Sequence, residues 1–171
     1  FHNFTASVTV VGDTVVSNDT TLSFVESLPV FAAPYSEDFE TFTTGFPGIL
    51  NNGWTFGNTT GYRWQVDDFG TFTFGTGPAD DHTDLGSIYM FTEANGSGII
   101  GDSTSLFSPC IDLTGLTAPR LSFWYHMFGA DMGTLEAYAV VGGTSTLLFS
   151  QAGQVQTSDV DDWEEGLGDL T

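Results

Sequence analysis

An acidic run in a glycine-rich segment is the part of the sequence best suited to bind an ion. Asp80, Asp81 and Asp84 lie close together, with His82 and Thr83 between them. Three carboxylates at this spacing repel one another unless a cation or hydrogen-bond donors neutralise them. Calcium is the cation that such oxygen ligands favour, and a solvated acidic loop is the alternative. The spacing lacks the order of an EF-hand loop, so no sensor-type site is expected.

The residue types needed for catalysis form no recognised pattern. His126 lies in a run of aromatic residues, which favours a packed, hydrogen-bonded histidine over a metal ligand. The sequence contains no H-E-x-x-H motif, no G-x-S-x-G motif and one cysteine, Cys110, so zinc-protease, multi-cysteine zinc and serine-hydrolase chemistry are not indicated. With 22 acidic residues, pairs that resemble a glycosidase site are expected by chance. We therefore predict a non-catalytic module.

The charge balance narrows the choice of partners. The 22 acidic residues face only Arg63 and Arg120, which gives a formal net charge of −20. Such a field repels phosphate backbones and anionic lipid headgroups, so nucleic acid and membrane surfaces are not expected partners. No stretch approaches the roughly 20 apolar residues that cross a membrane, so no membrane insertion is expected. Solubility or bound cations would explain the excess of acids.

Alternating apolar and polar residues predict an all-β protein. No long run has the i, i+3, i+4, i+7 spacing of a helix. The two clearest strands should direct alternate residues, starting from Leu121 and Leu135, into the core. Short strands separated by turn residues favour a jelly-roll β-sandwich. They are expected around residues 54–56, 62–66, 87–92, 104–107, 120–128, 134–141 and 146–150.

The two ends of the sequence indicate a piece of a longer protein. Residues 1–28 contain two alternating runs separated by Gly12 and Asp13, and a strand pair is marginal without a partner sheet, so we assign them to the end of a preceding domain. Residues 29–34 contain two prolines and are expected to be a linker. Residues 35–171 form the expected jelly roll. Its C-terminal part has Trp163, Leu167 and Leu170 among acids, so we expect a truncated domain without its final strand.

A series of ordered strings carries a family resemblance. They are Asp38-Phe39-Glu40, Gly53-Trp54, Trp64, Gly77-Pro78 through Asp81-His82-Thr83, Tyr89-Met90, Ser108-Pro109, and Leu121 through His126 followed by Gly133-Thr134-Leu135. In this order they resemble a MAM domain, the adhesion module of meprins, neuropilins and receptor-type tyrosine phosphatases. The resemblance implies a non-catalytic, extracellular adhesion or protein-interaction module within a larger cell-surface or secreted protein.

The resemblance also implies a metal site. MAM-like jelly rolls often hold a structural cation near the first strand. The matching positions assign Glu40 and Asp81 as side-chain ligands, with Asp80 and Asp84 as further candidates. A structural calcium ion is therefore expected.

The lone cysteine departs from the animal members, which carry disulfides, and implies the bacterial surface-adhesin branch. Residues 1–28 are similar to the immunoglobulin-like, cell-adhesion-related repeats of bacterial surface proteins, through Gly12-Asp13 and Ser17-Asn18-Asp19-Thr20. Together the two resemblances imply an exported modular protein of Bacteroidota. A protein or glycan at a cell surface is the expected partner, beside the neighbouring domains of the parent chain.

A carbohydrate-binding module attached to an exported hydrolase is the alternative function. Aromatic side chains can stack on sugar rings. The MAM-like positions of Trp54, Trp64 and Trp124 favour core packing for these three. The full set that could form a stacking platform is Trp54, Trp64, Trp124, Trp163, Tyr62 and Tyr138.

Overall fold

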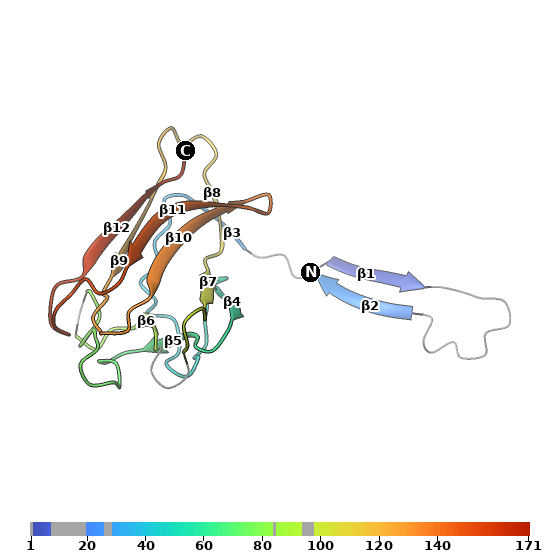
Figure 1. Cartoon of the computed structure of the whole chain (residues 1–171). Helices are drawn as coiled ribbons and strands as arrows, with labels where there is room; N and C mark the ends of the chain where they lie inside the picture. The colour runs from blue at the N-terminus through green and yellow to red at the C-terminus, as the bar shows by residue number, and fades with distance from the viewer. Residues whose placement is uncertain (1, 8–19, 26–28, 84, 94–97) are drawn as a thin grey trace.

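The computed structural model describes residues 2–7, 20–25, 29–83, 85–93 and 98–171, and these residues form strands and loops without a helix (Figure 1). The all-β prediction is therefore confirmed. No membrane-spanning helix is present in the described residues. The strands are β1 (His2–Ser7), β2 (Thr20–Val25), β3 (Val30–Ala32), β4 (Thr55–Thr59), β5 (Trp64–Asp67), β6 (Tyr89–Thr92), β7 (Thr104–Phe107), β8 (Cys110–Asp112), β9 (Arg120–Tyr125), β10 (Thr134–Val141), β11 (Thr144–Ala152) and β12 (Glu164–Asp169).

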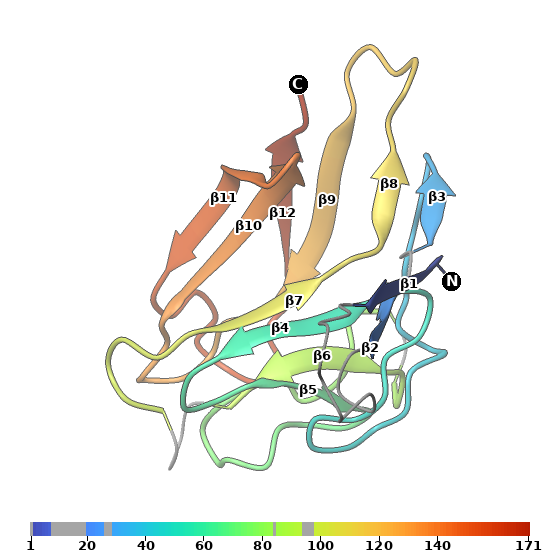
Figure 2. The ribbon, with the colours of Figure 1, turned by 90° about the vertical axis from the view of Figure 1, so that its right-hand side faces the viewer.

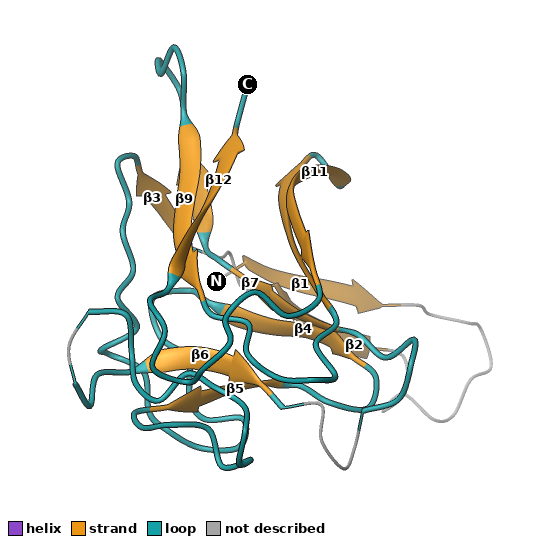
Figure 3. Ribbon diagram, turned by 60° about the vertical axis from the view of Figure 1, so that its left-hand side comes forward, coloured by secondary structure: helices purple, strands orange, loops and turns teal. Residues whose placement is uncertain are grey.

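The strands are hydrogen-bonded in pairs. β9 pairs with β12, β10 with β11, β4 with β7 and β5 with β6, all antiparallel, while β3 and β8 are parallel. Figures 2 and 3 show β4, β5, β6 and β7 lying across one end of the molecule, with β9, β10, β11 and β12 rising from it. β11 and β12 are also in contact, which joins the two long pairs. Several pairings connect segments far apart in the sequence.

The alternation predicted for the two clearest strands is confirmed over most of their length. In β9, Leu121, Phe123 and Tyr125 are partly buried while the residues between them are exposed, and β10 alternates in the same way from Leu135 to Ala139. Val141 was expected on the core face, but it is 77% exposed because β10 there enters its turn to β11.

β9 ends at Tyr125, earlier than expected, because the following carbonyl groups bond to loops. The Met127 carbonyl accepts hydrogen bonds from Val155 N and Gln156 N, at 2.8 and 3.3 Å. The Gln156 side chain is buried, accepting from Met127 N through Oε1 at 2.7 Å and donating through Nε2 to Asp162 O at 3.1 Å. Both ends of this buried amide are satisfied, so the loop after β11 is fastened to the end of β9.

The apolar core is centred on β5 and β6. Val66 of β5 is 1% exposed, and Tyr89 and Phe91 of β6 are 2% and 5% exposed. Tyr89 and Phe91 are two residues apart and therefore share one face of β6. Phe42, from the loop before β4, and Met127, after β9, complete the most buried apolar group in the described chain.

The segment predicted to be a linker is partly a strand. Within residues 29–34, β3 pairs in register with β8, from Val30 opposite Cys110 to Ala32 opposite Asp112. The backbone of this segment thus has hydrogen-bond partners that a free linker lacks. β1 and β2 pair only with each other among the described strands. Their assignment to a preceding immunoglobulin-like domain stays a prediction, and Gly12 and Asp13 lie outside the described residues.

β12 is a strand that the sequence pattern did not predict. It runs antiparallel to β9, with Gly166 opposite Phe123 and Gly168 opposite Leu121. Both glycines are buried, and a Cβ atom on Gly166 would lie 2.5 Å from Cζ of Phe123. Glycine is rare in strands because it packs no side chain, yet here it makes space for an aromatic ring from the neighbouring strand.

Replacing Gly166 with alanine tests this contact. The added methyl group would overlap the Phe123 ring, so Gly166→Ala should lower the free energy of unfolding by about 1–3 kcal/mol in urea denaturation. Gly133→Ala is the matched control, since a Cβ atom there meets nothing within 4 Å, and it should change stability by less than about 0.5 kcal/mol. Equal stability of the two variants would show that the glycine is not needed for packing.

Candidate functional site

The acidic loop before β6 is organised by its own carboxylates. Asp80 Oδ1 accepts hydrogen bonds from Asp81 N at 3.0 Å and Gly86 N at 2.7 Å. Asp81 Oδ2 accepts one from Thr83 N at 2.8 Å. These backbone donors offset part of the repulsion between the carboxylates. Asp84, the remaining acid of this loop, lies outside the described residues.

Glu40 is joined to the same segment from a distant part of the chain. Its Oε1 accepts a hydrogen bond from Ile88 N at 2.8 Å, and Ile88 follows two residues after Gly86, which Asp80 holds. The Glu40 backbone N–H donates to Asp38 Oδ1 at 3.2 Å. The structure therefore brings Glu40 and Asp80 to one short stretch of chain ahead of β6.

Tyr89 connects this loop to two more acids. Burial raises the pKa of Tyr89 far above its ordinary value, and the carboxylates of Asp67, Asp80, Asp81 and Asp68 raise it further. The acidic loop therefore lies near the end of β5. Asp67 and Asp68 were missed in the sequence, where their position at the end of a buried strand was the available signal.

Asp67 is the most buried of these acids. It is 9% exposed and pairs with Tyr89 across β5 and β6. Its Oδ1 accepts a hydrogen bond from Asp68 N at 3.0 Å, whereas its Oδ2 has no partner among the described residues. Burial raises the pKa of Asp67. No three His, Cys, Asp or Glu side chains of the described chain meet in a metal-binding group, so the calcium assignment stays a prediction.

Aromatic rings lie against the acidic loop. His82 stacks on Trp124, with ring centroids 4.0 Å apart and an interplanar angle of 15°. Trp163 meets both His82 and Tyr89 edge-on, at 6.3 and 6.0 Å. Trp124 was expected to pack in the core, but it is 47% exposed because the alternation of β9 turns its two neighbours inward instead. Its ring is covered in part by His82.

The other aromatic residues of the suggested stacking platform are spread over several strand pairs. Trp54 precedes β4, packs edge-on against Phe39 at 5.3 Å and donates its Nε1 hydrogen to Tyr35 Oη at 3.0 Å. Trp64 lies in β5 and is partly buried. Tyr138 lies in β10 and is 48% exposed. No ring contact joins Trp54, Trp64 and Tyr138 in the described structure, so they do not form a shared platform.

His126 is packed as predicted, without the hydrogen bond that was expected. It lies 5.8 Å from Trp163, and neither ring nitrogen has a partner among the described residues. Burial lowers the pKa of His126, while the nearby loop containing Ser158, Asp159 and Asp161 partly opposes this shift. The neutral imidazole is therefore the favoured form in the folded protein.

The described strands form an all-β module that carries this acidic loop. The family model for the MAM domain, meprin/A5/mu, matches residues 38–167, and the chain belongs to the MAM family. The matched residues include Glu40 and the acidic loop. The family implies a jelly-roll β-sandwich, and its domain is non-catalytic.

Several vertebrate proteins contain a similar region. The chain is 35% identical over 112 residues to Neuropilin-1a of Danio rerio, covering 63% of this chain and 11% of the relative. It is 38% identical over 95 residues to Thyroid hormone-induced protein B of Xenopus laevis, covering 53% and 13%. It is 28% identical over 138 residues to the human MAM domain-containing glycosylphosphatidylinositol anchor protein 2, covering 72% and 14%. The chain thus matches a small part of each relative's length. No solved structure matches it significantly.

The lowered pKa of His126 predicts a loss of stability in mild acid. Because the folded pKa lies below the value of about 6.5 for a free histidine, the unfolded chain takes up the proton first as the pH falls. The contribution should be complete above about pH 6.5 and decrease as the pH falls below it. His126→Gln should flatten the pH dependence of the free energy of unfolding below about pH 6.5, measured by urea denaturation. An unchanged slope in His126→Gln would contradict the assignment.

Proposed function

We propose that the chain is an extracellular adhesion module of a larger protein and binds another protein at a cell surface. The MAM match over residues 38–167 carries this proposal. MAM domains mediate protein–protein interactions at cell surfaces, and the homologous proteins are extracellular or cell-surface proteins.

An exposed sheet face supplies a candidate contact surface, which we call the outer face. It lies on the β10–β11 pair, where Tyr138 is directly opposite Leu147 and Val140 follows on the same side of β10. Tyr138, Val140 and Leu147 are 48%, 55% and 50% exposed. Exposed aromatic and aliphatic groups gathered among polar residues are typical of protein interaction sites.

An acid on the outer face and the charge of the whole chain favour a basic partner. Glu136, two residues before Tyr138 in β10, accepts a hydrogen bond from the Tyr138 hydroxyl at 2.9 Å. With a net charge of −20, the chain repels a second copy of itself and attracts a basic partner.

The bacterial surface-adhesin type remains our proposal for the origin of the chain. Cys110 is exposed and free, and it is the single cysteine of the sequence. The animal members carry disulfides that one cysteine cannot form. The similarity of residues 1–28 to immunoglobulin-like repeats of bacterial surface proteins supports an exported modular protein of Bacteroidota.

We also propose that a calcium ion stabilises the acidic loop. Glu40 and Asp80 hold backbone groups two residues apart, and each uses one carboxylate oxygen for these bonds. Asp81 is adjacent, and Asp67 contributes a buried oxygen without a partner in the described chain. These oxygen donors are the type that calcium prefers. A bound ion would neutralise the repulsion between the carboxylates.

Thermal unfolding with and without calcium tests this site. Calcium bound only to the folded state raises stability by mass action, so 5 mM calcium should raise the Tm of the wild type by several degrees. Glu40→Ala and Asp81→Ala should reduce this rise by at least half. Glu136→Ala removes an acid of the outer face and should retain it. If calcium raises the Tm of Glu40→Ala and Asp81→Ala as much as that of the wild type, these ligands are wrong.

Site-specific photo-crosslinking on cells that carry the parent protein tests adhesion through the outer face. A photoreactive amino acid in place of Tyr138 should crosslink to another extracellular protein. The same amino acid in place of Ile100, which is fully exposed in the loop before β7, is the control and should not. Adding 0.5 M salt should weaken the Tyr138 crosslink, because charge attraction is screened. Equal crosslinking from both positions, or none from either, would contradict the proposed surface.

A further inference from the structure

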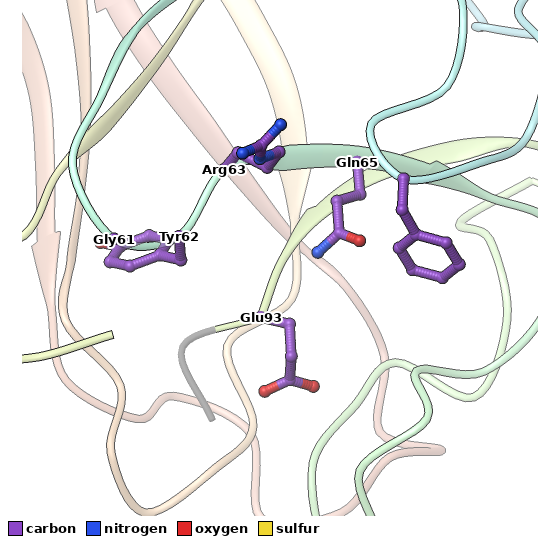
Figure 4. Close-up of a pocket in the computed structure, with 6 residues that line it drawn as sticks. Gly61, Tyr62, Arg63, Gln65 and Glu93 are labelled. Carbon is purple, nitrogen blue, oxygen red and sulfur yellow. The ribbon is translucent and has the colours of Figure 1, made fainter. Parts of the chain in front are cut away.

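A small pocket lies between the start of β5 and the end of β6. Its volume is about 250 Å³, and Figure 4 shows the residues that surround it. None of them belongs to the acidic loop or to the outer face. The lining residues are Phe46, Gly61, Tyr62, Arg63, Gln65 and Glu93.

Gln65 directs its amide into this pocket. It is 9% exposed, and its side chain leaves β5 on the side where Glu93 lies (Figure 4). Its amide makes no hydrogen bond within the described residues, and its oxygen and nitrogen are open to the pocket and not sealed from solvent. The other buried amide, Gln156, is bonded at both its oxygen and its nitrogen. A primary amide offers hydrogen-bond donors and an acceptor, so a ligand that both accepts and donates hydrogen bonds suits this position.

The pocket walls combine aromatic rings with groups of both charges. The Tyr62 hydroxyl donates to Asp102 O at 3.5 Å, which helps to position the ring. Phe46 is 62% exposed and supplies a second ring. Arg63 provides hydrogen-bond donors, and no ion pair involves it in the described part of the chain. Glu93, directly after β6, adds a negative charge to the lining.

The hydrogen-bonding groups, aromatic rings and charges of the pocket indicate which class of ligand it binds. Each sugar hydroxyl donates and accepts, as the Gln65 amide requires, and the apolar face of a sugar ring can pack on an aromatic side chain. Glu93 and the net charge of −20 oppose an anion, whereas a purely apolar ligand would leave Gln65 unsatisfied. Drug-sized ligands occupy roughly 300–1,000 Å³, so this pocket fits something smaller. We propose that the pocket binds one neutral sugar residue of a glycan, independently of protein binding at the outer face.

Saturation-transfer NMR with the methyl glycosides of glucose, galactose, mannose and N-acetylglucosamine tests this binding. At least one of the four should receive saturation from the wild-type chain. Gln65→Leu and Arg63→Met should each weaken that binding about tenfold or more, because each loses a hydrogen bond to the sugar. Tyr138→Ala, on the outer face, should bind the sugar as the wild type does.

Arg63 is exposed, so Arg63→Met is the informative variant if Gln65→Leu does not fold, as judged from its amide spectrum. The proposal is overturned if none of the four glycosides binds, if only an added uronic acid binds, or if both folded variants retain wild-type affinity. Each outcome is separate from the crosslinking result, because the two experiments probe different residues.

Discussion

The contact between Phe123 and the glycines of β12 is the constraint on which much of the structure depends. Gly166 lies directly opposite Phe123, and a Cβ atom at Gly168 would lie 2.7 Å from Cβ of Leu148 in β11. Because these two glycines have no side chains, there is room for Phe123 of β9 and Leu148 of β11 to pack against β12. Because Phe123 turns inward, Trp124 must turn outward. The packing of one aromatic ring thus directs Trp124 to the other side of β9, where it stacks on His82 of the acidic loop.

Backbone hydrogen bonds within the acidic loop offset part of the repulsion between its carboxylates. Asp80 and Asp81 each accept backbone hydrogen bonds within the loop, and Glu40 fixes the chain where the loop enters β6. These bonds order the loop with donors from the protein itself. Burial and the carboxylates of Asp67, Asp80, Asp81 and Asp68 raise the pKa of Tyr89, so its hydroxyl stays protonated. The order of the loop and the calcium binding proposed for it thus depend on the same carboxylates.

The alternation of apolar and polar residues made much of the fold predictable. Features that depend on contacts between residues distant in the sequence could not be predicted in this way. β7 and β10 have the bounds expected from their patterns, since alternation is a local property of strands. β12 was missed because Glu-Glu-Gly-Leu-Gly-Asp has no residue that favours a strand, and only the Phe123 ring makes its glycines useful. Asp80 and Glu40 were predicted from the acidic run and the MAM resemblance, whereas Asp67 was missed because its surroundings depend on which strand pairs with β5.

The two buried glutamines show how the same residue type can stabilise a fold or remain open for a ligand. Gln156 accepts from Met127 N and donates to Asp162 O, so its amide joins a loop to the end of β9. Gln65 is buried to a similar degree, yet its amide faces the pocket. The pocket exists only while β5 and β6 are folded together, so a ligand held there binds the folded chain and not the unfolded one. Binding in the pocket should therefore raise the stability of β5 and β6 by mass action.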